Sequence, residues 1–325
     1  MLAQLALYSD RFFMAAAGVF VLALVLHGWE FARERTAAPV LVGASEGVEA
    51  VNAGSVGAAT PAAEEPAPVG PVRGAARPRS ERMGRMGVSL VILGVLLQLV
   101  SIVLRGVAAG RWPLGNMYEF ISAITLAAMV TWLVVLRRNP SLRPLGAFVL
   151  FPVVILQFLG GTVLYTQAAP VMPALQSYWL IVHVTTVSIA SGLFFVPGIA
   201  SALFLLRTAD RLPAALAAKV PSADALDRLA YRVTIIAFPL YTFAVIAGAI
   251  WAEAAWGRFW GWDPKETVAF IAWVVYASYL HARATAGWRN GRAAWINVLG
   301  LVAVVFNLFF INLVVAGLHS YAGVN

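Results

Sequence analysis

The chain contains no cysteine among its 325 residues. It therefore forms no disulfide, offers no thiol nucleophile and supplies no thiolate to a metal ion. Any thiol chemistry in which the protein takes part must come from a partner. The sequence also lacks a phosphate-binding glycine loop and the internal repeat that is typical of many transporters.

Charge is scarce as well, because charged residues make up 12% of the chain and hydrophobic residues 61%, with a mean hydropathy of +0.81. A soluble domain of this length could not bury so much apolar surface. Several segments reach the roughly 20 apolar residues of a transmembrane helix, which favours helices over a β-barrel. We predict an all-α, polytopic transmembrane helical bundle of about eight spans. The spans are expected at residues 12–29, 87–105, 117–136, 145–165, 178–206, 233–252, 265–282 and 293–317.

The lysines and arginines are divided unevenly between the two alternating sets of loops. One set holds 18 of the 23, and the other holds only Arg11, Arg105, Arg111, Arg258 and Lys265. The positive-inside rule makes the first set cytoplasmic, so both termini and the loop at 253–266 are expected outside. The net charge of +8 then follows from topology, and a nucleic-acid partner is disfavoured.

The composition divides the chain into three parts. Residues 1–30 hold the first expected transmembrane helix, and residues 87–325 hold the other seven. Between them, residues 31–86 are rich in Ala, Gly, Pro and Val without helical periodicity or caps, which predicts a disordered cytoplasmic linker. Asp10 and Arg11 before the first helix, and arginines after it, favour a retained helix over a cleaved signal peptide.

The segment WGRFWGWDPKE, residues 256–266, concentrates aromatic and charged side chains in one predicted external loop. A glycine-containing loop lets the backbone approach a ligand closely, and its large flat side chains could form a platform for a planar aromatic ligand. The three tryptophans of this loop are Trp256, Trp260 and Trp262. Arg258 and Lys265 add cations that suit a ligand with carboxylates. Isolated tryptophans such as Trp112 and Trp251 are instead typical of the aromatic belt at a membrane interface.

The end of this segment also has the pattern of a helix start. Asp263 precedes Pro264, and Glu266 follows three residues after Asp263. This spacing predicts an N-cap carboxylate, proline at the first helical position and a glutamate that completes a capping box. Asp263 is therefore expected to cap the helix first, with contact to a ligand as the alternative.

Only four histidines occur, and the expected spans place them at two depths. His183 and His319 fall at the external face, and His281 and His27 near the cytoplasmic face. A lone interfacial histidine is commonly just a hydrogen-bonded polar residue, whereas ionisable residues inside spans indicate function. Two imidazoles beside an aromatic platform suit the axial positions of haem iron, and haem is both planar and dicarboxylate. Zinc would need more ligands than this loop brings together.

WGRFWGWDPKE resembles the tryptophan-rich WWD signature of haem-handling proteins in cytochrome c biogenesis, in the form found in the CcsA (ResC) family. Four more segments fit the same pattern. They are PLGNMYE at 113–119, YWLIVHV at 178–184, YLHAR at 279–283 and GLHSY at 317–321. The resemblance covers about residues 85–325.

The resemblance implies system II cytochrome c biogenesis in a bacterial cytoplasmic (inner) membrane. Haem b would be bound, moved across the membrane and presented outside for thioether attachment to the CxxCH segment of apocytochrome c. The implied partners are a CcsB (ResB) membrane protein and, indirectly, a thioredoxin-like thiol reductant. The chain would be the haem-handling subunit of a cytochrome c haem lyase complex, without an acid or base catalyst of its own.

The resemblance also implies roles for individual residues. His183 and His319 match the external axial ligands of haem iron, and His281 matches the histidine of an inner haem site. The signature itself falls on Trp256, Trp260, Trp262 and Asp263. The family takes the second inner ligand from a CcsB partner or partner domain, which this chain lacks, and His27 lies at a suitable depth to replace it.

Three other functions stay open from the sequence. The first is a haem carrier without ligase activity, of the CcmC or CcmF type, which shares the tryptophan loop. The second is a transporter for an unrelated solute, and the third is a structural membrane scaffold. The last two predict no Soret band in the purified protein, so one absorption spectrum separates them from the haem-binding functions.

Overall fold

The computed structural model describes residues 1–33, 79–171, 176–285, 288 and 291–319. Over these residues all regular secondary structure is helical. The elements are α1 (Leu2–Arg33), α2 (Arg79–Ala109), α3 (Met117–Arg138), the 3₁₀ helix η1 (Pro140–Leu145), α4 (Gly146–Thr162), α5 (Tyr178–Thr208), α6 (Ala214–Ala217), α7 (Ala223–Trp256), α8 (Pro264–Ala284) and α9 (Gly291–Leu313). The predicted all-α bundle is confirmed, with a long helix at each of the eight expected places.

Seven of the long helices are apolar enough to cross a membrane: α1, α2, α3, α4 with η1, α5, α7 and α9. The eighth, α8, has 21 residues and a length of about 31 Å at 1.5 Å per residue. Its hydropathy is lower because Lys265, Glu266, His281 and Arg283 lie within it. The chain is thus a multi-pass membrane protein.

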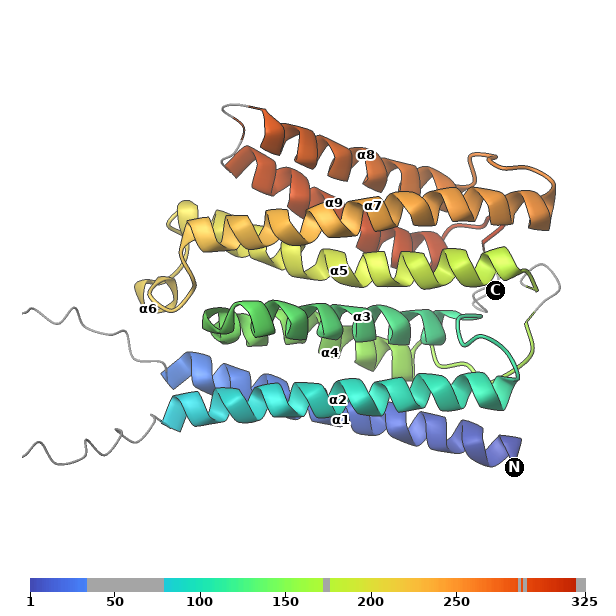
Figure 1. Ribbon diagram of the computed structural model, residues 1–325, viewed down its shortest axis with the longest axis horizontal. Coiled ribbons are helices and arrows are strands. Elements are labelled where there is room, and N and C mark those ends of the chain that lie inside the picture. Colours follow the sequence, from blue (N-terminus) through green and yellow to red (C-terminus); the bar gives the residue numbers. More distant parts are fainter. Residues whose placement is uncertain (34–78, 172–175, 286–287, 289–290, 320–325) are drawn as a thin grey trace, which may run out of the picture.

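The two ends of the bundle carry different loops (Figure 1). The start of α1, the turn between α2 and α3, and the loop between α7 and α8 lie at one end, here called the tryptophan-loop end. The end of α1, the start of α2 and the short helix α6 lie at the other, here called the linker end. The segments found together at each end are those that the count of loop arginines assigns to the same side of the membrane. That the tryptophan-loop end faces outside stays a prediction from their distribution.

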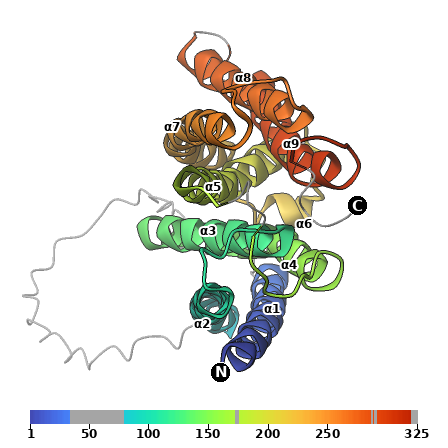
Figure 2. The same cartoon turned by 90° about the vertical axis from the view of Figure 1, so that its right-hand side faces the viewer.

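Helices α3 and α5 form the centre of the bundle. Figure 2 shows α1, α2 and α4 on one side of α3, and α5, α7, α8 and α9 on the other. These two helices are also the most buried of the candidate spans. At Gly192 of α5, a Cβ atom would lie 2.6 Å from the carbonyl oxygen of Ile124 in α3. A glycine is therefore required at this close contact between the two central helices.

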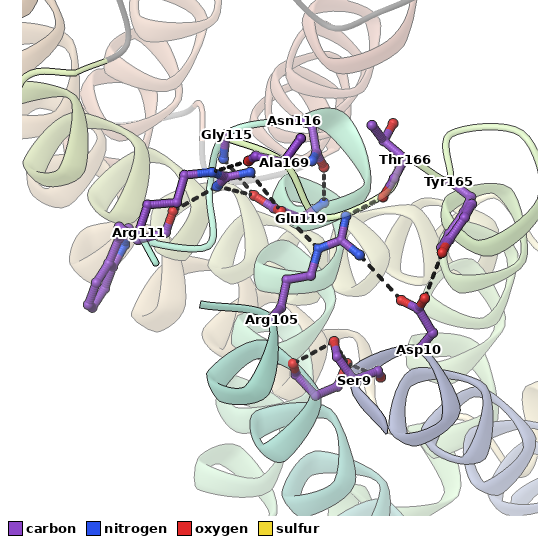
Figure 3. A network of polar contacts seen from close by, with 12 residues as sticks. Ser9, Asp10, Arg105, Arg111, Gly115, Asn116, Glu119, Tyr165, Thr166 and Ala169 are labelled. Carbon is purple, nitrogen blue, oxygen red and sulfur yellow. Dashed lines mark hydrogen bonds and ion pairs between the residues drawn. The ribbon is translucent and has the colours of Figure 1, made fainter. Parts of the chain in front are cut away.

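Buried ions join three helices at the tryptophan-loop end (Figure 3). The guanidinium of Arg105, on α2, is 2% exposed and donates from Nε to Oε1 of Glu119, on α3, over 3.0 Å. It also pairs with Asp10 of α1 at 3.3 Å and donates to the carbonyl oxygen of Thr166. The Tyr165 hydroxyl donates to the other Asp10 oxygen over 2.6 Å. The network ties α1 and α2 to α3 and to the segment that follows α4.

The PLGNMYE segment supplies the rest of this network. Asn116 is the N-cap of α3 and accepts a hydrogen bond from the backbone N–H of Glu119. The Glu119 carboxylate accepts from the N–H of Gly115 and pairs with Arg111 at 2.8 Å (Figure 3). Two guanidinium groups and a backbone donor surround this buried carboxylate and offset the cost of its burial. The segment therefore closes a turn and anchors the end of α3.

The predicted linker is shorter than expected at both ends. Helix α1 continues to Arg33 and helix α2 begins at Arg79, so residues 31–33 and 79–86 are helical, and the prediction of disorder is wrong there. Residues 34–78 lie outside the described part of the chain. The first helix packs along α2 and against α4, so it belongs to the same bundle as the other seven.

Candidate functional site

The tryptophan loop is fixed at both ends by specific caps. Helix α7 ends at Trp256, and the residue that caps it, Gly257, has a φ of 68° in the left-handed region. Helix α8 begins after Asp263 with the predicted capping box, in which the Glu266 carboxylate accepts from the N–H of Asp263 over 3.1 Å. The same carboxylate accepts from the N–H of Gly261 over 2.9 Å. Trp262 has a φ of 59°, a strained conformation for a bulky residue, and these bonds on either side hold it there.

Asp263 also holds His319. Its Oδ2 atom lies 2.8 Å from Nδ1 of His319, and its Oδ1 accepts from the N–H of Leu318 over 2.7 Å. A Cβ at residue 317 would lie 2.7 Å from Oδ1, which explains the glycine of the GLHSY segment. An ionised carboxylate can only accept, so Nδ1 carries the proton and the lone pair of the imidazole is on Nε2.

The pKa shifts of this pair agree with that assignment. Burial lowers the pKa of His319 below its ordinary value, which favours the neutral imidazole. Burial alone would raise the pKa of Asp263, but the hydrogen bonds from His319 and Leu318 outweigh it and leave this pKa lower than usual. A neutral imidazole oriented by a carboxylate is the common arrangement of a metal-ligating histidine.

His183 is held by a different acceptor with the same result. It lies in the second turn of α5, with Nδ1 2.8 Å from the carbonyl oxygen of Ala244 in α7. A carbonyl oxygen can only accept, so the lone pair of this imidazole is also on Nε2. A Cβ on Gly248 would lie 2.7 Å from the His183 ring, so the glycine provides the room for this contact.

Trp251 contacts both of these histidines. It is 1% exposed, and its ring is parallel to that of His183 with centroids 5.9 Å apart. The ring of His319 meets it edge-on at 5.7 Å, and Trp256 packs against both Trp251 and His319 at 4.7 and 5.0 Å. The assignment of Trp251 to an interfacial aromatic belt is therefore wrong. Small residues one turn apart before it, at Ala244, Ala247 and Gly248, indicate a packed helix face that could have shown this from the sequence.

The three loop tryptophans do not form one flat platform. Trp256 lies with the histidines, whereas Trp260 and Trp262 contact each other edge-on at 5.8 Å and both meet Phe270 of α8 at 6.3 Å. Trp260 lines the cavity described below, and Trp262 is 66% exposed. The ring that stacks on His183 is that of Trp251, which belongs to α7 and not to this loop.

The two cations of the loop have different partners. The Arg258 guanidinium lies 3.3 Å from the Glu266 carboxylate and 5.9 Å from the centre of the Trp256 ring. The Lys265 ammonium instead donates to Oδ1 of Asn312, on α9, over 2.6 Å.

Two cavities adjoin the histidine pair. The larger is partly open, and its lining includes His183, His319, Lys265, Trp260 and Tyr241. The smaller shares the first three of these residues and reaches Asn116 at the start of α3. Over the described residues, no group of three or more His, Asp or Glu side chains could hold a bare metal ion. Two imidazoles with their lone pairs on Nε2 suit an iron that a macrocycle already holds.

The remaining two histidines lie far from each other. His281 is exposed on α8, in an apolar groove formed with Trp273, Trp288 and Ile296. His27 of α1 is fully buried, 3.4 Å from Glu30 and against Gly87 and Gly146. Helices α1 and α8 lie on opposite sides of the bundle (Figures 1 and 2). The suggestion that His27 completes a site with His281 is therefore wrong for a single copy of this chain. Counting residues along helices gave comparable depths but not the faces on which the two side chains lie.

Comparison with known proteins identifies relatives for most of this structure. Residues 114–319 match the protein family described as Cytochrome C assembly protein. A cytochrome c biogenesis protein CcsA from Synechococcus sp. (strain RCC307) is 34% identical over 258 residues, covering 71% of this chain and 83% of that protein. The CcsA protein of Chlamydomonas reinhardtii is 36% identical over 247 residues, covering 74% and 68%.

A solved structure shares the fold. The structure titled Cytochrome c Heme Lyase CcmF matches 94% of this chain with a TM-score of 0.61 and 17% sequence identity. This chain spans 46% of that protein. At this identity the match shows a common fold, and it extends over helices α1 and α2, which the family match does not reach.

Proposed function

The chain belongs to the cytochrome c assembly family, in its CcsA branch, and on this premise we propose that it binds haem b as a substrate and presents it for attachment to apocytochrome c. In this proposal the tryptophan-loop end faces outward from a bacterial cytoplasmic membrane. The observation that carries the proposal is the pair formed by His183 and His319. Each has its Nδ1 bonded to an acceptor, and both line the same two cavities beside Trp251.

The chain's own residues position and protect the haem. His183 and His319 would donate their Nε2 lone pairs to the iron, and Asp263 and the Ala244 carbonyl would hold the two rings in place. Trp251 and Trp256 would pack against these ligands, and Trp260 would line the macrocycle's cavity. Reactivity comes from the haem vinyl groups and the substrate thiols, so the protein contributes orientation and exclusion of side reactions.

Attachment would use sulfur from the substrate alone, in keeping with the absence of cysteine here. Apocytochrome c would bring its CxxCH segment to the tryptophan-loop end, where its histidine replaces one of the two external ligands. Each thiol then adds across one vinyl group, with sulfur bonded to one carbon and hydrogen to the other. A thioredoxin-like reductant would act earlier, by keeping the two substrate cysteines reduced.

The groove at His281 is proposed as the entry site at the cytoplasmic side. His281 is exposed there, and the groove around it carries tryptophan and aliphatic side chains. Because His27 lies on the opposite side of the bundle, the second ligand at this site is proposed to come from a CcsB-type partner seated against α8.

The experiment that tests the external site is an absorption spectrum of the purified protein. The chain should retain haem with a low-spin, bis-histidine spectrum. His183→Ala and His319→Ala should each lower haem retention and remove that spectrum, while Trp295→Phe, at an exposed position on α9, should change neither. Haem content that is unaffected in both histidine variants would overturn the assignment.

A second experiment separates attachment from simple carriage. The chain is reconstituted with and without a CcsB-type partner, and thioether formation is measured on a CxxCH peptide. Attachment with the partner supports the proposed function. Haem binding without attachment under both conditions would favour a haem carrier.

A further inference from the structure

Lys265 lies at the two cavities that adjoin His183 and His319. It lies in the first turn of α8 and lines both cavities, together with His183 and His319. Its Nζ atom donates to Oδ1 of Asn312 over 2.6 Å. The Asn312 amide is oriented by a second bond, from Nδ2 to the carbonyl oxygen of Leu308, over 2.7 Å. The lysine is therefore held in place by a fixed neutral acceptor.

The charge of Lys265 is unfavourable where it lies. The N-terminal turn of a helix carries partial positive charge, so a cation there is destabilising, and partial burial adds a desolvation cost. The side chains of the nearby carboxylates are bonded to groups other than the Lys265 ammonium. Asp263 accepts from His319 and from the backbone N–H groups of Leu318 and Lys265, and Glu266 accepts from Arg258 and from two backbone N–H groups. Within the described part of the chain, Lys265 forms no ion pair with a carboxylate at hydrogen-bonding distance.

We propose that Lys265, oriented by Asn312, binds a propionate carboxylate of the haem held between His183 and His319. This inference rests on the proposed function and names the group that recognises the acidic edge of the ligand. An ammonium whose partner is a neutral amide gains a charge-assisted bond when a carboxylate enters the cavity. Arg258, the other cation of the loop, is already paired with Glu266.

Such an ion pair would set the rotation of the macrocycle as well as its affinity. Two axial histidines fix the iron but leave the ring able to turn about the axis through them. Propionate and vinyl groups occupy different edges of haem b, so a carboxylate held at Lys265 determines which edge carries the vinyl groups toward a substrate. Lys265 is thus a positioning residue for attachment, distinct from the iron ligands.

The test compares haem with haem dimethyl ester, in which both propionates are neutral. Each porphyrin is titrated into the purified, haem-depleted chain and followed by its absorption spectrum. The unmodified chain should bind haem roughly tenfold more tightly than the ester, as expected for the loss of one hydrogen bond to a charged group. Lys265→Met should weaken haem binding by about this factor and remove the preference, while the bis-histidine spectrum persists. Lys265→Arg should restore most of the preference.

Arg258→Met is the matched control, because it removes a cation from the same loop. It should leave the preference for haem over the ester unchanged. Lys265→Gln, which keeps a polar side chain of similar length, replaces Lys265→Met if that variant does not accumulate. A preference retained in Lys265→Met or Lys265→Gln, or lost equally in Arg258→Met, would overturn the inference while the bis-histidine spectrum still supported the proposed function. If the unmodified chain did not show the bis-histidine spectrum, the proposed function itself would be overturned.

Discussion

Asp263 and His319 are joined by a hydrogen bond of 2.8 Å, although 56 residues separate them along the chain. The bond connects the first residue before α8 to the segment that follows α9. One carboxylate therefore does two things, because it caps a helix and fixes the orientation of an imidazole. A functional defect at Asp263 can arise through His319 without any contact between Asp263 and haem.

Replacing Asp263 should weaken His319 as a proposed haem ligand. Asp263→Asn keeps a hydrogen-bond acceptor but loses the negative charge, so the His319 imidazole becomes a poorer donor to iron. We expect haem affinity to fall by about 10- to 100-fold, the usual cost of losing such a support, and the midpoint potential of bound haem to rise. Equilibrium titration and spectroelectrochemistry measure the two effects.

The control for this substitution is Glu266→Gln, which disturbs the same capping box without touching His319. It should weaken the loop through its bonds to Gly261 and Arg258 but leave the potential close to that of the unmodified protein. Equal shifts in potential for the two variants would show that Asp263 acts only as a cap.

Gly248→Ala should displace His183. The added Cβ would lie 2.7 Å from the His183 ring, closer than packed atoms tolerate, so the ring must leave its position beside the Ala244 carbonyl. We expect a loss of the low-spin spectrum with little change in protein yield. Gly18→Ala is the matched control, since a Cβ at Gly18 of α1 meets no atom within 4 Å, and a parallel loss there would exclude this explanation.

The haem-free protein should lose stability as the pH falls below neutral. Burial depresses the pKa of His319 below its ordinary value of 6.5, so the unfolded chain binds a proton there more readily than the folded chain. The stabilising contribution is therefore complete above pH 6.5 and is lost as the pH falls toward the lower folded value. The depressed pKa of Asp263 gives a second loss, below its ordinary value of 3.8.

Thermal unfolding in detergent across this pH range provides the measurement. His319→Asn should reduce the loss of stability below pH 6.5, because this titrating group is gone. If the unmodified protein became more stable on acidification and the variant did not, the pKa of His319 would be raised on folding, and this prediction would be wrong.

Glu119→Gln should destabilise the bundle strongly. The Glu119 carboxylate neutralises Arg105, which is 2% exposed, and Arg111, so the amide would leave two guanidinium groups without their shared anion. Breaking a buried ion pair from one side costs about 3–5 kcal/mol. The decrease would be seen in thermal unfolding and in the yield of extracted protein.

Glu81→Gln provides the comparison on α2. Glu81 pairs with Arg85 at 3.5 Å on a largely exposed surface, where such pairs contribute about 0–1 kcal/mol. Similar losses for Glu119→Gln and Glu81→Gln would show that the buried network adds little to stability.

The sequence predicts whatever depends on local composition and spacing. Apolar length gives the helices, arginine counts give the grouping of loops, and the spacing of Asp263, Pro264 and Glu266 gives the start of α8. Each of these follows from residues that are near one another in the chain, so no knowledge of packing is required.

Features that depend on which helix face meets which neighbour could not be predicted in this way. Trp251 was assigned to the interface because hydropathy does not show that its ring stacks on His183. His27 was placed at a suitable depth, but depth along α1 does not say that the side chain lies between α2 and α4. Arg105 and Arg111 were counted as loop charges, although both pair with a carboxylate inside the bundle.

The buried network at Glu119 also bears on how the molecule can be divided. The family match begins at residue 114, which would suggest a self-sufficient piece starting there. Such a fragment would lack Arg105 and Arg111 and would keep a buried carboxylate that accepts from the N–H of Gly115 but has lost both guanidinium partners. Helix α2 must therefore accompany the rest, and Asp10 extends the same requirement to α1 through Arg105. The smallest unit of this protein that can fold by itself is set by where its charges are neutralised, and this lies upstream of residue 114, where the family match begins.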